Sequence, residues 1–224
     1  MAIFNTVYGG EWKWKPWSNT LLYLPLNWNL NDESWNWYNW TWSAWTEKYA
    51  TLSSWLQVAE FSWWLSRVTT SFTQTPTTIS LRWYKSTSLS DPSVNGYKLY
   101  AWQASSDSGN WWRLRMVTSS STQRLWYQNG SEEHQNQYNY KDTWVHMVAT
   151  YNGSNTLFYI NWSLVYTYTS WMNAQTWLYL WTSPRDTTST YSLYWYVSNV
   201  IIEGKQRTAQ EVAKYYNSTK SNYS

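Results

Sequence analysis

Residues 143–168, TWVHMVATYNGSNTLFYINWSLVYTY, form a pattern of three short strands joined by two tight turns. Val145, Met147 and Ala149 alternate with the residues between them, the period of two that is typical of a β-strand. Asn152-Gly153 follows as a hairpin signal, because both residues tolerate positive φ. The stretch therefore predicts a first strand that ends at residue 151, a return strand over 157–161 and a third strand over 164–168.

The second turn of this stretch, Asn161-Trp162, carries an unexpected residue. A two-residue turn of this kind favours Asn-Gly, because glycine adopts positive φ at the second position without steric cost. Tryptophan lacks that freedom. We therefore expect backbone strain at Trp162.

The order of motifs in this stretch and after it resembles that of the LamG-like (concanavalin A-like) jelly-roll domains. The run from Trp144 to Gly153 is W-x-H-x-x-x-T-Y-N-G, and a strand ending at Ile202 precedes a short helix over 208–216. Trp195 stands where the family has glycine. The resemblance covers about residues 21–216. It implies an all-β, two-sheet antiparallel jelly-roll sandwich with one short C-terminal helix.

The remaining sequence predicts the same architecture, because many short strands separated by turn signals are typical of a two-sheet sandwich. Thr208 and Glu211 have the spacing of a capping box for the helix. We expect an N-terminal arm over residues 1–20, a jelly-roll domain over 21–217 and a frayed polar tail over 218–224. The further strands are predicted over residues 21–26, 58–61, 65–68, 77–85, 97–103, 112–118, 123–128, 178–182 and 191–202.

Tryptophan and glycine occur in unusual proportion, 23 Trp against 7 Gly in 224 residues. Glycine is ordinarily about 7% of a protein, and many of these tryptophans follow Asn or Ser, as the glycines themselves do. We therefore hypothesise that most of them are glycines encoded by UGA in an organism that reads this codon as glycine. The alternative is a protein rich in exposed tryptophan. Trp83 and Trp144 are taken as genuine, since both lie in strand patterns where the family commonly has an aromatic residue.

Charge and composition exclude several classes of protein. The net charge of +3, without a Lys/Arg cluster, does not suggest nucleic-acid binding. The chain has no cysteine and no apolar run of roughly 18 residues that would span a membrane. Residues 1–10 lack the pattern of a signal peptide, so we expect a location on a cell surface by another route of export, or in a virion.

Catalytic motifs are not evident in the sequence. The glucanases that share the jelly-roll fold carry Glu-x-Asp-x-Glu on a strand, and glycoside hydrolysis ordinarily needs two carboxylates across the scissile bond. Glu132 and Glu133 are adjacent, so on a strand they would belong to opposite faces. His146 is interpreted as a structural strand residue. We therefore expect a protein that is not an enzyme.

A calcium site is implied by the resemblance, because LamG-like domains often hold one Ca²⁺ at the rim of the sandwich through oxygen ligands. Asp32, Ser34 and Asn36 match the D-x-S-G-N stretch of the family. Ser198 departs from it, since many relatives have Asp there. The alternative is a loop held together by Asx turns.

Carbohydrate binding is the other property that the resemblance implies, on a sheet face or on the loops. Arg113 and Arg115 share one face of a predicted strand, and Tyr127 and Gln128 come from the next strand. These four residues are the candidate sugar ligands. The alternative is an ordinary solvated sheet face.

The resemblance thus implies non-catalytic recognition of a glycan or another surface ligand, as in an adhesin or a phage appendage. The first alternative is a structural module that assembles into a phage particle or surface appendage through residues 1–20, without binding glycans. The second is a glycoside hydrolase of the same fold.

Overall fold

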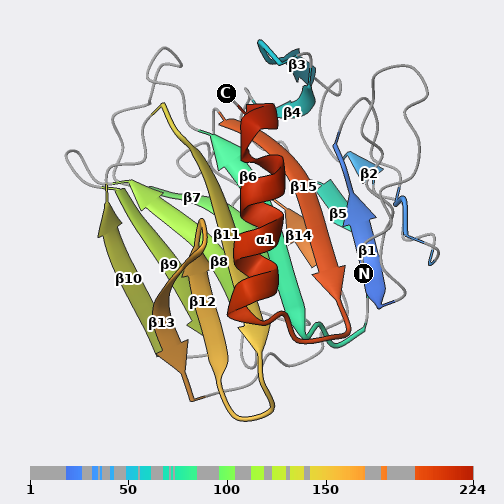
Figure 1. Cartoon of the computed structure of the whole chain (residues 1–224). Coiled ribbons are helices and arrows are strands. Elements are labelled where there is room, and N and C mark those ends of the chain that lie inside the picture. The colour runs from blue at the N-terminus through green and yellow to red at the C-terminus, as the bar shows by residue number, and fades with distance from the viewer. Residues whose placement is uncertain are drawn as a thin grey trace.

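The computed structural model describes residues 19–26, 32–34, 36, 41–42, 49–54, 56–61, 68–70, 72, 74–84, 96–103, 112–118, 123–129, 132–138, 142–169, 178–180 and 195–223. They form two antiparallel β-sheets packed face to face, with one α-helix on the outside (Figure 1). The predicted fold class, an all-β sandwich with a short C-terminal helix, is confirmed.

The eight-stranded sheet lies in the middle of the molecule and is built around β6 and β15. Its path runs β13-β12-β11-β6-β15-β4-β3, and β1 pairs with the second half of β15. The strands are β1 (Thr20–Leu24), β3 (Tyr49–Thr51), β4 (Gln57–Phe61), β6 (Thr78–Tyr84), β11 (Trp144–Tyr151), β12 (Thr156–Ile160), β13 (Ser163–Tyr168) and β15 (Trp195–Glu203).

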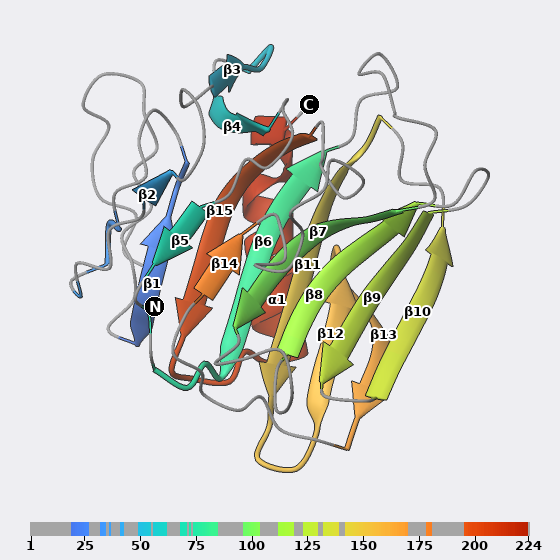
Figure 2. The same ribbon diagram turned by 180° about the vertical axis from the view of Figure 1, so that it is seen from behind.

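The seven-stranded sheet covers one face of the first sheet, as the view from behind shows (Figure 2). Its order is β10-β9-β8-β7-β14-β5-β2. The strands are β2 (Thr41–Trp42), β5 (Val68–Thr70), β7 (Gly96–Gln103), β8 (Trp112–Thr118), β9 (Gln123–Asn129), β10 (Glu132–Tyr138) and β14 (Leu178–Leu180).

The middle of the eight-stranded sheet is covered on both faces, which explains why β6 is almost wholly buried. Ile79, Leu81 and Trp83 belong to the face turned toward the seven-stranded sheet, where they join the main hydrophobic core. Their neighbours Ser80 and Arg82 belong to the face covered by α1 (Ala209–Thr219). Alternation along one strand thus separates an apolar core from a polar layer beneath the helix.

The helix begins at the predicted capping box. The Thr208 side chain accepts a hydrogen bond from the Glu211 N–H, and the Glu211 side chain accepts one from the Thr208 N–H. Val212 and Tyr215 are the buried residues of the helix. Val212 packs with Val148, and Tyr215 belongs to a cluster on β1 and β15.

The C-terminus is more ordered than the sequence predicts. The helix continues to Thr219, and a 3₁₀ turn, η2 (Lys220–Tyr223), follows it. Tyr223 is buried, and its ring lies 4.7 Å from the ring of Trp144. Over residues 218–223 the prediction of a frayed tail is therefore wrong, because the ring of Tyr223 packs against Trp144 although the rest of the segment is polar. Residues 1–18, which hold most of the predicted arm, lie outside the described part of the chain.

The turn between β12 and β13 differs from the prediction. Positive φ occurs at Asn161 (59°), and Trp162 is not among the positive-φ residues. Asparagine tolerates this left-handed conformation better than most residues do. The expected strain at Trp162 is therefore wrong. In the preceding turn Gly153 has φ 93°, as its hairpin signal predicts.

Three strands escaped the sequence analysis, β2, β3 and β10. The first two are two and three residues long, and the third is rich in polar residues. The strand predicted over 65–68 overlaps β5 (Val68–Thr70) at Val68. Residues 65–67 lie outside the described part of the chain. Within the described residues no helix is long and apolar enough to cross a membrane.

Candidate ligand-binding site

Three aromatic side chains form a row across the central sheet. Trp144 on β11 lies opposite Tyr84 on β6, and Tyr84 lies opposite Tyr196 on β15. The ring of Tyr84 is 5.6 Å from that of Trp144 and 6.0 Å from that of Tyr196. Directly opposite residues share a face of a sheet, so the row belongs to the face that α1 covers further along. All three residues are only partly buried.

This row borders a cleft of about 470 Å³ at the end of the sheet where the chain terminates. Tyr223 of η2 is one wall, and Leu52 and Ser53 between β3 and β4 are another. Figure 1 shows β3, β4 and the C-terminus together at this end of the molecule. The volume lies within the range of about 300–1,000 Å³ that small-molecule sites occupy.

Tyr223 is held firmly in that wall. The Arg82 guanidinium lies 4.6 Å from the centre of its ring, on the buried side. Its hydroxyl is 3.2 Å from Ser198 Oγ and accepts a hydrogen bond from the Asn199 side-chain amide. Asn199 occupies the left-handed region (φ 52°) beside a bulge of β15. Packing against Arg82 therefore holds the Tyr223 ring, and hydrogen bonds hold its hydroxyl.

Asp142 supplies a carboxylate at the rim of the cleft. It has φ 53°, a conformation that Asp tolerates, and it directly precedes the turn into β11. The Tyr84 hydroxyl donates a hydrogen bond of 3.4 Å to Asp142 Oδ1. Burial raises the pKa of Tyr84, and the Asp142 charge raises it further. The phenol thus stays protonated at neutral pH and available as a donor.

The sequence did not single out this cleft. Trp144 was recognised as a genuine aromatic residue, but Tyr84 and Tyr196 were not connected with it. Tyr84 lies 60 residues before Trp144 and Tyr196 lies 52 residues after it. Only the pairing of β11, β6 and β15 brings the three residues together. An aromatic residue at the end of each of three strands was the available signal.

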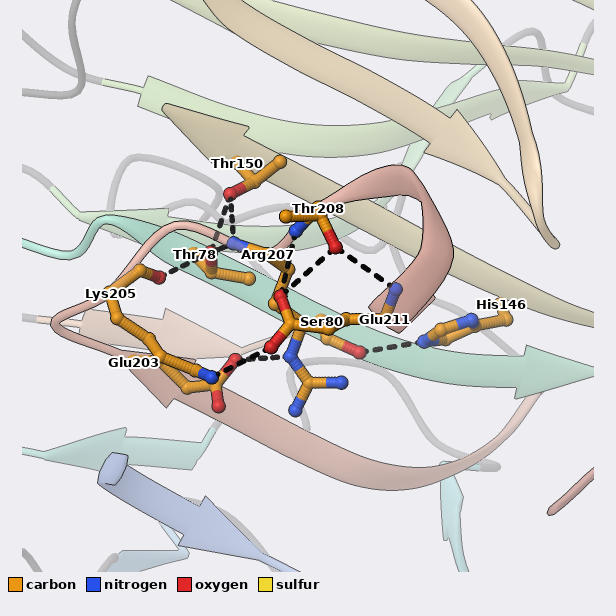
Figure 3. Close-up of polar contacts among 9 residues, drawn as sticks. All are labelled: Thr78, Ser80, His146, Thr150, Glu203, Lys205, Arg207, Thr208 and Glu211. Atoms are coloured by element: carbon orange, nitrogen blue, oxygen red, sulfur yellow. Dashed lines mark hydrogen bonds and ion pairs between the residues drawn. The ribbon is translucent and has the colours of Figure 1, made fainter. Parts of the chain in front are cut away.

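A buried polar layer lies beneath the helix on the same sheet face (Figure 3). Ser80 Oγ is 2.7 Å from His146 Nε2, and both side chains are fully buried. The Arg207 N–H donates to Thr150 Oγ1 at 2.9 Å. Arg82 donates to Thr219 Oγ1 at 2.5 Å, which ties the sheet to the end of the helix. These contacts anchor the helix, which agrees with a structural role for His146.

Glu203 and Arg207 form an ion pair within this layer. Arg207 Nε donates to Glu203 Oε2, and the exposed fractions of the two side chains are 1% for Arg207 and 0% for Glu203. Burial raises the pKa of Glu203, although the bond to Arg207 opposes this shift. The Arg207 guanidinium also lies 5.0 Å from the centre of the Tyr215 ring. The sequence analysis identified neither charged residue as buried.

We expect stability to fall in mild acid because of His146. Burial lowers the pKa of His146 well below 6.5, and Arg82 and Arg207 lower it further. The unfolded chain therefore takes up a proton that the folded chain resists, so stability is complete above about pH 6.5 and decreases below it, by up to about 1.4 kcal/mol per pH unit. Urea unfolding at pH 7 and pH 5 measures the slope.

His146→Gln should flatten this slope, whereas the control His134→Gln, on β10 of the other sheet, should leave it unchanged. An equal slope in the protein and in His146→Gln would contradict the assignment.

The four predicted sugar ligands do not all meet on one face. Arg113 pairs with Gln128 across β8 and β9, and Arg115 is two residues further on, so these three belong to one face of the seven-stranded sheet. Tyr127 pairs with Leu114 and belongs to the opposite face. That face also holds Leu99, Met116 and Leu125 in register.

The predicted calcium residues come together beside β1. Asp32 Oδ1 accepts from the Tyr23 and Ser34 N–H groups at 3.0 and 2.8 Å, and Oδ2 accepts from Ser34 Oγ at 2.7 Å. Asn36 Nδ2 donates to the carbonyls of residues 20 and 21. Both carboxylate oxygens are thus engaged by protein donors, and no metal-binding group of three acidic, His or Cys residues occurs among the described residues. These contacts hold the loop together by hydrogen bonds.

Comparison with solved structures supports the fold. The receptor-binding domain of botulinum neurotoxin D has a TM-score of 0.63 at 12% identity, covering 90% of this chain and 53% of that chain. The serotype D ligand-binding domain in complex with N-acetylneuraminic acid has 0.63 at 11%, covering 89% and 51%. Domain 4 of AbnA, a GH43 extracellular arabinanase from Geobacillus stearothermophilus, in complex with arabinotriose, has 0.62 at 14%, covering 88% and 97%.

The chain thus spans about half the length of the neurotoxin domains and nearly all of the arabinanase domain. No protein-family model and no curated protein matches its sequence. At such low identities the structural likeness establishes the β-sandwich fold, and function has to be argued from the site.

Proposed function

We propose that this protein is a non-catalytic, LamG-like carbohydrate-binding module, and that the cleft at Trp144 binds the sugar. One observation carries the proposal: four aromatic rings, including Tyr223, and the Asp142 carboxylate come from separate parts of the chain and border one cleft. Aromatic surfaces with a few polar groups are the usual composition of small-ligand sites. Domains of similar fold that were solved with N-acetylneuraminic acid and with arabinotriose support this reading.

The lining of the cleft argues against glycoside hydrolysis there. Glycosidases need two carboxyl groups about 5–9.5 Å apart. Among the described residues that line the cleft, Asp142 supplies the one carboxylate.

Trp144→Ala should reduce glycan affinity at least about tenfold. The substitution removes one ring of the row, and an aromatic contact contributes about 0.5–1.5 kcal/mol beyond the area that it buries, where 1.4 kcal/mol is tenfold. A glycan array followed by calorimetry on its strongest hit measures the effect. Tyr166→Ala is the matched control, since Tyr166 is an exposed aromatic residue on β13 of the same sheet. Unchanged affinity in Trp144→Ala would exclude the cleft.

The face of the seven-stranded sheet to which Arg113 and Arg115 belong is the alternative binding surface. It holds Arg113, Arg115 and Gln128, three of the four predicted sugar ligands, in register. The same calorimetric assay distinguishes the two surfaces. If Arg113→Ala and Arg115→Ala abolish binding and Trp144→Ala does not, the sugar binds on this face.

Assembly into a larger particle is the second candidate function, and the edge strand β13 favours it. Trp162, Leu164 and Tyr166 are 57%, 51% and 38% exposed there, and residues 161–169 carry no charge. Edge strands without charged residues are prone to pair with another chain. Self-association that Leu164→Lys abolishes, measured by light scattering, would support this function, in addition to any contact through residues 1–20.

A virion part or a surface adhesin is the setting that we propose for the protein, and most of its tryptophans are proposed to be glycines recoded from UGA. Trp83 and Trp144 are taken as genuine tryptophans, and the structure is compatible with this. Trp83 is fully buried, and Trp144 borders the cleft. Mass spectrometry of peptides from native material decides the question, because tryptophan at position 162 would refute recoding there.

The calcium site at Asp32, Ser34 and Asn36 stays a prediction. A ligand that binds only the native state raises the melting temperature. A melting temperature that is unchanged by millimolar CaCl₂ would exclude the site, leaving the hydrogen-bonded loop.

A further inference from the structure

We propose that Asn152 is a site of spontaneous covalent modification, at which the side-chain amide is lost as ammonia and a carboxylate takes its place. The reacting groups are the Asn152 amide and the backbone nitrogen of Gly153, at the tip of the β11–β12 hairpin. Figure 1 shows this turn at one end of the central sheet and the C-terminus at the other, and Tyr223 beside the C-terminus lines the cleft. The inference therefore does not depend on the proposed function.

The carbonyl of the Asn152 side chain is held by two backbone donors. Its Oδ1 accepts a hydrogen bond from the Ser154 N–H at 3.0 Å and another from the Asn155 N–H at 2.7 Å. The Asn152 N–H in turn donates to the Asn155 carbonyl at 2.9 Å, which closes the turn. Donors aimed at a carbonyl oxygen stabilise the negative charge that develops on it when a nucleophile attacks the carbon. The turn thus activates Cγ of Asn152.

The backbone nitrogen of Gly153 is available as the nucleophile. Among the described residues, no hydrogen bond uses the Gly153 N–H, whereas the next two N–H groups of the turn are both bonded to Asn152. Gly153 has φ 93°, and a Cβ added to it would meet nothing within 4 Å. The residue thus lies in open space, and because it has no side chain, its nitrogen can approach Cγ closely.

The reaction is balanced by a single water molecule. The Gly153 nitrogen gives up its proton and bonds to Asn152 Cγ, which closes a cyclic imide, while the bond from Cγ to Nδ2 breaks and ammonia leaves. Water then opens the ring at one of two bonds. Cleavage between Cγ and the Gly153 nitrogen leaves aspartate, and cleavage of the backbone bond leaves isoaspartate, in which the chain runs through Cγ. Water has access, because Asn152, Gly153 and Ser154 are exposed.

Asn155 and Asn199 lack this combination and serve as internal controls. Asn155 lies in the same turn but precedes Thr156, which is fully buried and branched at Cβ. Asn199 precedes Val200, which is also buried and branched, and its amide donates to the Tyr223 hydroxyl. A branched side chain obstructs the approach of the adjacent nitrogen, and a misplacement of about 1 Å can slow an oriented reaction roughly 100-fold.

Peptide mapping of aged protein tests the proposal. The purified full chain is kept in mildly alkaline buffer for several weeks, digested with chymotrypsin and analysed by mass spectrometry. We expect Asn152 to convert at least about tenfold faster than Asn155 and Asn199, with isoaspartate among the products. The rate should rise with pH, because the Gly153 nitrogen must lose its proton to attack. Equal rates at the three asparagines would overturn the proposal.

Gly153→Ala should slow the reaction at Asn152 by at least about tenfold, because a methyl group beside the nitrogen obstructs its approach. The positive φ strains alanine, so Gly153→Asp is the second variant, since aspartate tolerates this conformation and also carries a Cβ. Gly204→Ala is the matched control outside the turn, where the new Cβ makes ordinary contacts with Leu21 at 3.5 Å. If both variants at Gly153 react as fast as the control, attack by this nitrogen is excluded.

The product adds a negative charge to an uncharged part of the sequence. Residues 143–184 contain no Asp, Glu, Lys or Arg, so the aged chain should separate by ion exchange as a more acidic species. Asn152→Asp is the marker for the aspartate form of this species and should elute with it. Glycan binding at the opposite end of the sheet should be the same in both species. If no acidic species forms, the proposal fails whatever the glycan assays show.

Discussion

Glu203→Gln should destabilise the folded protein by about 3–5 kcal/mol, one of the two largest effects that we expect from a single substitution. The change keeps the shape of the side chain and removes its charge, so the Arg207 guanidinium loses its ionic partner in a buried layer. Breaking a buried pair on one side costs this much, because a charge is left uncompensated away from water. The free energy of unfolding in urea measures the loss.

Two further variants determine whether the buried charge is the cause. Lys205→Met removes the ion pair with Glu211, whose side chains are 30% and 36% exposed at a distance of 2.9 Å, and should cost less than about 1 kcal/mol. The double substitution Glu203→Leu with Arg207→Met removes both charges and should cost less than Glu203→Gln alone. If Glu203→Gln costs no more than Lys205→Met, the pair contributes little to stability.

Trp83→Ala should cost a similar amount, about 3–5 kcal/mol, which is typical when a large aromatic side chain is removed from a core. Trp83 is fully buried and lies in the main hydrophobic cluster between the two sheets. Its neighbours in the cluster come from strands of different parts of the chain, so the cavity would disturb the centre of the sandwich. The midpoint of urea unfolding measures the effect, provided that the slope of the transition is unchanged.

Trp162→Gly is the control for this substitution and also bears on the recoding proposal. Trp162 is 57% exposed in the turn after β12, so its removal should change stability by no more than about 0.5 kcal/mol. Glycine brings no relief of strain there, because the positive φ of this turn occurs at Asn161. A cost for Trp162→Gly equal to that of Trp83→Ala would mean that this tryptophan is a structural residue and not a stand-in for glycine.

The sequence by itself determined the strands whose patterning is local. The alternation around Met147, the turn signal at Gly153 and the capping box at Thr208 each depend on residues within a few positions of one another. The strand at 112–118 and the start of the helix were therefore predicted closely. Together with the order of the motifs, these local signals were sufficient for the class of the fold, an antiparallel sandwich with one C-terminal helix.

Only the tertiary structure determined which polar residues are buried and where the candidate site lies. Arg82, Glu203 and Arg207 look like ordinary surface residues in the sequence, and they are buried because α1 covers the second face of the central sheet. Trp144, Tyr84 and Tyr196 form a row because of the register of three strands that are distant in sequence. Tyr223 completes the cleft from a segment expected to fray. Register and layer contacts join residues that are far apart along the chain, so no local pattern could have predicted them.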